Sequence, residues 1–402
     1  MALSNTTERY GSVTKTFHWL MALLIFSLIG MGWYAERLPY ETDAELARKA
    51  WFFSMHKTFG VLAFFVALLR IFWALSQRKP GLINSDRRLE SFAAETVHWL
   101  LYGALVIVPL SGWISHAAAS GFAPIWWPFG QSLPLVPKSV QVEHAFSVVH
   151  WISGQILVLS ILFHVAGAIK HHVIDRDCTL RRMAPGIWPV ETPPAAVHRQ
   201  TPLASGVAIW GIALFAGVSI ANNDAETAVA PEVTLAKVTS DWIVETGSID
   251  ITVLQLGSEV KGSFADWTAA ISFDETAPRG EVGSVTATIA IPSLSLGSVT
   301  DQAMGTDFFD AANHATAVFD AKIMRDPETG YTAAGTLNIK GAEVPLELPF
   351  DLLIEEGTAD MIGTVTLNRM DFGIGNSMQD EGSLGFAVTV DITLRANNRP
   401  MS

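Results

Sequence analysis

The first half of the chain contains five long apolar runs, and each of them predicts a helix that crosses a membrane. An α-helix needs about 20 mostly apolar residues to cross the hydrocarbon core of a bilayer. Tryptophan and tyrosine residues stand near the ends of these runs, as they do in the aromatic belts of membrane proteins. The predicted spans are Phe17–Tyr34, Phe53–Leu75, Val97–Ser115, Val148–Ile169 and Leu203–Ala221.

The pattern changes at Asp241, where apolar and polar positions begin to alternate. Between Phe386 and Leu394, for example, every second residue is apolar. Turn sequences such as DPETG at 326–330 and KGAEVP at 340–345 recur between such runs. This pattern predicts an antiparallel barrel or sandwich of about 160 residues. Four phenylalanines are candidates for lining its interior: Phe308, Phe309, Phe319 and Phe350.

Composition separates the same two parts of the chain. Half of the 402 residues are hydrophobic, and the mean hydropathy is +0.32. Residues 1–222 carry 17 Lys and Arg against 12 Asp and Glu, whereas residues 223–402 carry 9 against 27. The acidic part is therefore not expected to bind nucleic acid. Cys178 is the single cysteine, and the lack of a C-x-x-C-H motif excludes covalently attached haem. The first apolar run has the length of a span, so no cleavable signal peptide is expected.

Basic residues predict the orientation of the spans. The second loop contains Arg78, Lys79, Arg87 and Arg88, and further basic residues follow the fourth run. The positive-inside rule then places both ends of the four-helix unit in the cytoplasm. The fifth run leads the chain to the other side. We therefore expect a multi-pass protein of the bacterial inner membrane, with its N-terminus in the cytoplasm and its C-terminal barrel in the periplasm.

Histidines inside the spans are the strongest functional signal, because ionisable residues are rare there. His150 and His164 are 14 residues apart, which places them about 21 Å apart on nearly the same helix face. Sorted by depth, His18 should meet His164 near the inner side, and His56 should meet His150 near the outer side. Each pair could supply two axial nitrogens to one haem iron. The alternative is that these histidines form hydrogen bonds that merely join the helices.

Three other histidines compete for these places. His98 is the inner competitor, and His116 and His144 are outer competitors at or beyond the ends of spans. Gly60 and Gly154 follow His56 and His150 by four residues. A missing side chain there would let a flat ring pass close to the backbone, although small residues also serve ordinary helix packing.

Arg70 is a further charge inside a span. It follows His56 by 14 residues, so it shares the face of His56 but lies at inner depth. A guanidinium there favours an anionic partner, such as a haem propionate, or a quinone headgroup. The alternative is that Arg70 extends to the cytoplasmic interface.

Residues 9–185 resemble the bacterial cytochrome b561 family of four-helix membrane cytochromes. The matching motifs are FHWL at 17–20, MHKTFG at 55–60, HW-x2-G from His150, HH at 171–172 and the RDCTLRRMAP that follows. The resemblance implies two non-covalent haem b groups, with His18, His56, His150 and His164 as axial ligands. It also implies electron exchange with ubiquinone, and some members accept electrons from superoxide. His171 lies on the face of His164 and is the candidate for contact with the quinone head.

Residues 241–396 resemble the YceI family of lipocalin-like barrels. The motifs are DFFDAANHATAVF at 307–319, GTLNIKGAEVPLELPF at 335–350 and LNRMDFGIG at 367–375. The resemblance implies an apolar pocket that holds an isoprenoid chain, such as that of a polyprenyl quinone. It assigns no particular site residues.

The expected organisation is a membrane domain at 1–185, a segment at 186–240 with a linker, a fifth helix and a tether, and a barrel domain at 241–402. We expect an oxidoreductase or electron carrier linked to quinone, with an external isoprenoid-binding barrel. The alternative is an isoprenoid carrier in which the helices serve as an anchor. A divalent-metal transporter is disfavoured, because the spans lack carboxylates.

Overall fold

The computed structural model describes residues 2–81, 83, 87–119, 122–186, 188, 200–227, 235, 238, 240–326, 328 and 330–398. The predicted linker and tether lie largely outside these residues. The chain divides into two compact units. The first contains residues 1–38, 51–119 and 124–227, and the second contains residues 39–50, 120–123 and 228–402.

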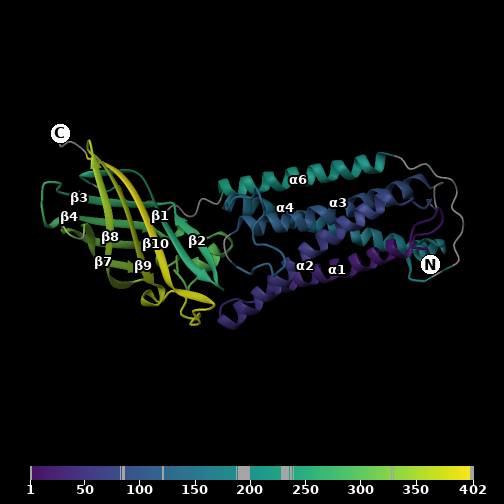
Figure 1. The fold of residues 1–402 in the computed structure, drawn as a ribbon, viewed down its shortest axis with the longest axis horizontal. Helices are drawn as coiled ribbons and strands as arrows, with labels where there is room; N and C mark the ends of the chain where they lie inside the picture. The colour runs from purple at the N-terminus through teal and green to yellow at the C-terminus, as the bar shows by residue number, and fades with distance from the viewer. Residues whose placement is uncertain are drawn as a thin grey trace. The chain divides into compact units, whose positions relative to one another are not determined.

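The first unit is helical (Figure 1). In the described part of the chain, five of its helices are long and apolar enough to cross a membrane, and each contains one predicted span. Two short elements follow the fourth long helix: the π-helical turn η1 (His171–Asp175) and α5 (Thr179–Met183). The long helices are α1 (Ser12–Arg37), α2 (Asp43–Ser76), α3 (Arg88–Ala118), α4 (Val140–Lys170) and α6 (Thr201–Thr227).

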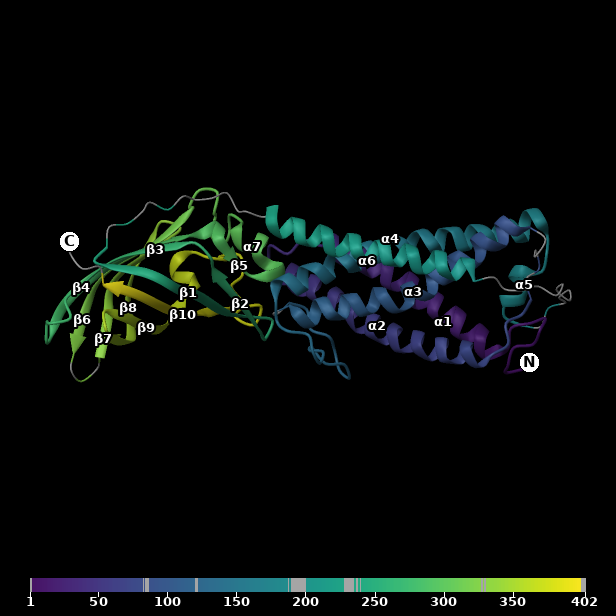
Figure 2. The ribbon, with the colours of Figure 1, turned by 90° about the horizontal axis from the view of Figure 1, so that it is seen from above.

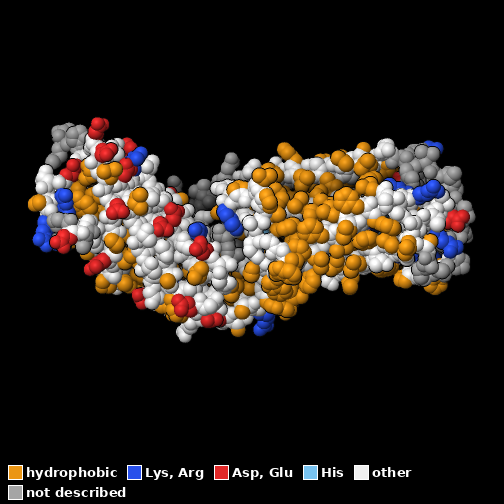
Figure 3. All heavy atoms as spheres, in the orientation of Figure 1, with side chains coloured by type: hydrophobic (Ala, Val, Ile, Leu, Met, Phe, Trp, Pro, Cys, Tyr) orange, Lys and Arg blue, Asp and Glu red, His pale blue; other side chains and the backbone are white. Residues whose placement is uncertain are grey.

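Small side chains lie inside this unit and large apolar ones lie on its surface. Ala67, Ala104 and Ser153 are each at most 1% exposed. Small residues between helices are typical of membrane proteins, where close packing replaces a hydrophobic driving force. Apolar side chains cover much of the outer surface of the helices (Figure 3). Large side chains that are more than half exposed include Leu23, Phe26, Leu69, Phe72, Phe163, Ile212 and Phe215.

Basic segments that are far apart in the sequence meet at one end of the helices. Lys15 Nζ donates a hydrogen bond to the Ala184 carbonyl at 2.9 Å. Arg182, which is 7% exposed, donates to the carbonyls of Glu8 at 3.0 Å and Gly81 at 2.9 Å. These bonds join the N-terminal segment, the α2–α3 loop and the segment after α4. The basic segments after α2 and α4 therefore lie at the same end of the helical unit.

The second unit is built on one ten-stranded antiparallel sheet, with the strand order β3-β4-β6-β7-β8-β9-β10-β1-β2-β5 (Figure 2). Besides the two-residue β5 (Leu294–Ser295), its strands are β1 (Trp242–Gln255), β2 (Ser258–Phe264), β3 (Trp267–Phe273), β4 (Gly280–Ala290), β6 (Thr316–Asp326), β7 (Gly330–Ile339), β8 (Ala342–Glu355), β9 (Thr358–Asn368) and β10 (Leu384–Asn398). The sheet curls and brings β3, at one edge, back to β1: the N–H of Asp241, just before β1, donates to the Ile271 carbonyl in β3 at 3.0 Å.

Local sequence explains the turns and the interior of this sheet. Lys340 and Gly341 join β7 to β8 with φ angles of 53° and 80°. Positive φ at both central residues is the geometry of a tight hairpin turn. Apolar residues of neighbouring strands form buried clusters, including Phe319 in β6, Leu337 in β7 and Leu348 in β8. The predicted fold class is confirmed: membrane-spanning helices are followed by a curled antiparallel sheet that forms a half-barrel.

Candidate functional site

The structure brings the predicted inner pair of histidines together. The ring centroids of His18 in α1 and His164 in α4 are 6.1 Å apart, and the ring planes differ by 59°. His98 in α3 joins this group, with its centroid 5.1 Å from that of His164. The Nδ1–H of His98 donates to the Ala94 carbonyl at 2.7 Å. Three imidazoles from three helices therefore lie at one level of the bundle.

The predicted outer pair also meets. The ring centroids of His56 in α2 and His150 in α4 are 6.3 Å apart, with perpendicular planes. The Nδ1–H of His56 donates to the Leu28 carbonyl at 3.0 Å, and that of His150 donates to the Val108 carbonyl at 2.8 Å. A carbonyl can only accept, so Nδ1 carries the proton in both rings. Each neutral ring therefore has the lone pair of Nε2 available for a metal.

Both separations fit an iron between two imidazoles. A bond between imidazole nitrogen and a metal is about 2.0 Å long, and the nitrogen is about 1 Å from its ring centre, so the two centroids should be about 6 Å apart. The His18–His164 and His56–His150 separations of 6.1 and 6.3 Å agree with this value. The His98–His164 separation of 5.1 Å is shorter.

Glycines leave space beside the ligand candidates. A Cβ atom added at Gly60 or Gly154 would meet nothing within 4 Å, which agrees with the room expected one turn from His56 and His150. Two further glycines beside the rings, Gly32 and Gly112, were not identified from the sequence. A Cβ added at Gly112 would lie 2.9 Å from the ring of His150, and one at Gly32 would lie 3.1 Å from the ring of His56. These contacts join different helices, so spacing along one helix does not reveal them.

His116, the outer competitor, has both ring nitrogens engaged. Its Nε2 lies 2.8 Å from Gln131 Oε1, and its Nδ1 lies 3.3 Å from Lys57 Nζ. If Nε2–H donates to the amide oxygen, Nδ1 accepts from the ammonium. This small polar network adjoins His56 through Lys57, and it leaves His116 less suited to hold a metal.

Arg70 lies at the level of the inner histidines. Its guanidinium is 5.7 Å from the ring centroid of Tyr102, and it lies within electrostatic range of His18 and His164. Among the described residues, Arg70 forms no ion pair. A half-buried guanidinium in this position is suited to an anionic group on a bound molecule.

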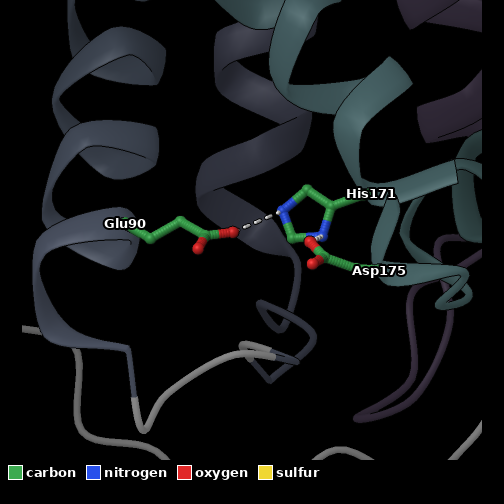
Figure 4. Close-up of side chains that lie close together, drawn as sticks. All are labelled: Glu90, His171 and Asp175. Carbon is green, nitrogen blue, oxygen red and sulfur yellow. Dashed lines mark ion pairs between the residues drawn. The ribbon is translucent and has the colours of Figure 1, made fainter. Parts of the chain in front are cut away.

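His171 lies in the π-helical turn that follows α4, among carboxylates (Figure 4). Its Nδ1 is 2.6 Å from Asp177 and 3.4 Å from Asp175, and its Nε2 is 3.4 Å from Glu90. Lys170 pairs with both Glu90 and Asp175, at 2.5 and 2.8 Å. The residues Glu90, His171 and Asp175 are close enough to hold a metal ion. The ammonium of Lys170 already supplies Glu90 and Asp175 with a positive partner, so these carboxylates do not need a metal ion to balance their charge.

The sheet encloses an apolar cavity of about 290 Å³. All four phenylalanines predicted to line the interior do so: Phe308, Phe309, Phe319 and Phe350. Apart from two indole groups, the polar side chains in the lining are Gln255, Gln302 and Arg369. The sequence pattern did not indicate these three. Concave and mainly apolar cavities with few polar groups are typical of small-molecule sites.

Comparisons with known proteins agree with this division of the chain. Over 186 residues, 46% of this chain and 95% of the relative, the chain is 29% identical to cytochrome b561 homolog 2 of Escherichia coli. Over 179 residues, 44% of this chain and 97% of the relative, it is 22% identical to the probable superoxide oxidase CybB of Yersinia pestis.

Two solved structures are similar to the sheet part. BcnA of Burkholderia cenocepacia is 26% identical, covering 38% of this chain and 96% of BcnA, with a TM-score of 0.35. The YceI protein of Campylobacter jejuni is 20% identical, covering 44% of this chain and 96% of that protein, with a TM-score of 0.32.

Two family models match the chain in separate regions. The model of prokaryotic cytochrome b561 matches residues 9–186, and the model of the YceI-like domain matches residues 238–396. The first match covers α1 to α5, which contain both histidine pairs, and the second covers the curled sheet and its cavity. Residues 9–186 are thus a domain of the prokaryotic cytochrome b561 family, and residues 238–396 are a YceI-like domain.

Proposed function

We propose that residues 9–186 form a di-haem cytochrome that carries electrons across the membrane to or from the ubiquinone pool. The observation that supports this most directly is the pair of ring separations, 6.1 and 6.3 Å, at two levels of the bundle. His18 and His164 would hold one haem b, and His56 and His150 the other. A haem held by two histidines supplies reversible one-electron chemistry, which suits electron transfer.

Other residues have distinct tasks in this proposal. The carbonyls of Leu28 and Val108 hold the outer imidazoles in the tautomer and orientation that a metal requires. Arg70 binds an anionic haem propionate or the head of a quinone near the inner pair. His171 contacts the quinone head, and Asp177, 2.6 Å away, orients its ring. The similarity to a probable superoxide oxidase supports superoxide as one electron donor.

The haem content of the purified full-length protein tests this proposal. Pyridine haemochrome analysis should give two haem b per chain, and a reduced-minus-oxidised spectrum should show b-type bands. One haem per chain, or none, contradicts the di-haem assignment.

We also propose that both ends of the four-helix unit face the cytoplasm and that the sheet unit lies in the periplasm. The basic segments joined at one end of the helices support this orientation. Protease added to spheroplasts should therefore cleave the sheet unit, whereas inverted membrane vesicles should protect it. Protection in spheroplasts would reverse the assignment.

We propose that the cavity of the sheet unit holds the apolar chain of an isoprenoid, including that of ubiquinone. Its almost wholly apolar lining supports this occupant. The same cavity favours a second candidate function, in which the helices only anchor an isoprenoid carrier. A full-length protein that co-purifies with isoprenoid but without haem would support this second function over the first.

A further inference from the structure

Two amide side chains, each with an unpaired polar atom, line the mainly apolar cavity. Gln255 ends β1 and is 4% exposed, and its buried Oε1 has no hydrogen-bond partner among the residues that the structure describes. The Nε2 of Gln302, in the short helix α7 (Thr300–Met304), is also buried without a partner. Both side chains line the cavity. Buried amide groups are usually hydrogen-bonded, so an unpaired acceptor and an unpaired donor in one cavity require an explanation.

These two groups lie at the same end of the sheet. Gln255 is paired with Leu384 at the start of β10 and with Ser258 at the start of β2. The neighbour of Gln302, Ala303, packs in a buried cluster with Val260 of β2. The Phe309 N–H donates to the Ala303 carbonyl at 3.0 Å, and the adjacent Phe308 packs against a buried cluster that contains Leu384. Leu384 is the partner of Gln255 in β10, so α7 lies near the end of β1 at which Gln255 is placed.

Arg369 cannot bind a charged ligand at this end of the cavity. It is 3% exposed, and its guanidinium donates only within the protein. Nε donates to the Gly385 carbonyl at 3.0 Å, and Nη2 donates to the carbonyls of Leu384, at 3.0 Å, and of Met378. Nη1 donates to the carbonyls of Ile374 and Gly375, both at 2.8 Å. Arg369 is the one charged residue among the described residues of the lining, so a phosphate or carboxylate head would find no free cationic donor in that part of the structure.

A hydroxyl group has the properties that these neighbours require. It can donate to an oxygen such as Gln255 Oε1 and accept from an N–H such as that of Gln302. A carbonyl or an ether can only accept, so it would leave the Gln255 oxygen unpaired. A charged head would lose its hydration without gaining an ionic partner.

We propose that Gln255 and Gln302 form a subsite for the uncharged hydroxyl head of an isoprenoid. This rests on the proposed isoprenoid cavity and adds the chemistry of the head. Of a quinone and its quinol, the quinol alone carries hydroxyls, so the cavity should favour the reduced form. The apolar chain extends from this end along the cavity, between the inner faces of the strands.

Trp242 offers an alternative position for a polar head. Its Nε1 is also buried, unpaired and in the cavity lining, but it begins β1, whereas Gln255 ends that strand. A fully extended strand of this length spans about 40 Å, so the two positions are well separated. A Trp242→Phe variant removes that donor while keeping an aromatic side chain, and it therefore serves as the matched control.

The test uses the full-length protein in detergent and three probes that share one apolar chain: geranylgeraniol, its methyl ether and its monophosphate. We expect the alcohol to bind at least about tenfold more tightly than either of the others. Gln255→Leu and, separately, Gln302→Leu should reduce affinity for the alcohol toward that for the ether, whereas Trp242→Phe should retain the difference. Equilibrium dialysis with radiolabelled probes measures these affinities.

The possible results separate the two proposals. Equal binding of the alcohol and the ether by the unmodified protein overturns the hydroxyl subsite but leaves the isoprenoid cavity in place. Loss of the difference in Trp242→Phe, but not in Gln255→Leu, also overturns the subsite, because the head would lie at the opposite end. No binding of any of the three probes overturns the isoprenoid cavity itself.

Discussion

Replacing His150 by alanine should halve the haem content of the full-length protein, and replacing His164 by alanine should do the same at the other level. In the native chain the ring centroids are 6.3 Å apart in the His56–His150 pair and 6.1 Å apart in the His18–His164 pair. Each substitution leaves a single imidazole at its level. A haem iron with one axial histidine is held much less firmly than an iron with two. The double variant should retain no haem.

Haem per chain, determined by pyridine haemochrome, checks this prediction, together with the b-type bands in reduced-minus-oxidised spectra. His172→Ala is the matched control, because His172 is an exposed histidine in the π-helical turn after α4 and belongs to neither pair. It should retain both haems. Unchanged haem content in His150→Ala, or equal losses in all three single variants, would contradict the assignment of ligands.

Replacing Arg369 by methionine should strongly destabilise the sheet unit. The guanidinium is buried and donates to five backbone carbonyls between residues 374 and 385. Methionine fills much of the same volume but leaves those carbonyls without their donor. Breaking a buried charged network in this way costs on the order of 3 kcal/mol. The segment that joins β9 to β10 should loosen first, because Arg369 holds both of its ends.

Hydrogen–deuterium exchange of the full-length protein in detergent measures this effect. The slowest amides of the strands should exchange about 100-fold faster if the free energy of unfolding falls by that amount. Lys322→Met is the control: Lys322 forms an ion pair with Glu281 at 2.7 Å, and its side chain is 66% exposed. Its loss should cost less than about 1 kcal/mol. Similar exchange in both variants would show that Arg369 has no special role.

The sequence was most informative where one periodic pattern determined the structure. Apolar runs located all five long helices, because a span needs a continuous apolar segment. The helix ends were less predictable: α2 begins at Asp43, ten residues before its predicted span at Phe53. Its first turns carry charge and therefore lack the apolar signal. Depth along the helices also paired His18 with His164 and His56 with His150, and the structure brings both pairs together.

Contacts that depend on a departure from regular helix geometry, or on how the sheet curls, could not be predicted from the sequence. The position of His171 was deduced from regular α-helical geometry, but a π-helical turn begins at that residue. Two of its three neighbouring carboxylates, Glu90 in α3 and Asp177 after the turn, come from segments that a helical projection does not include. Gln255 and Gln302 were missed for a related reason. Only the curled sheet shows that a strand end and a short helix border the same cavity.

The hydrogen bonds of the outer pair also determine how readily that site can accept a cofactor. The rings of His56 and His150 are each attached to the backbone of another helix, at Leu28 in α1 and Val108 in α3. Neither ring can rotate without breaking such a bond, so both are preorganised by the folding of the helices. Little rotational entropy then remains to be lost when an iron is inserted between them. Incorporation of the haem that we propose at this pair should accordingly require little rearrangement of the surrounding helices.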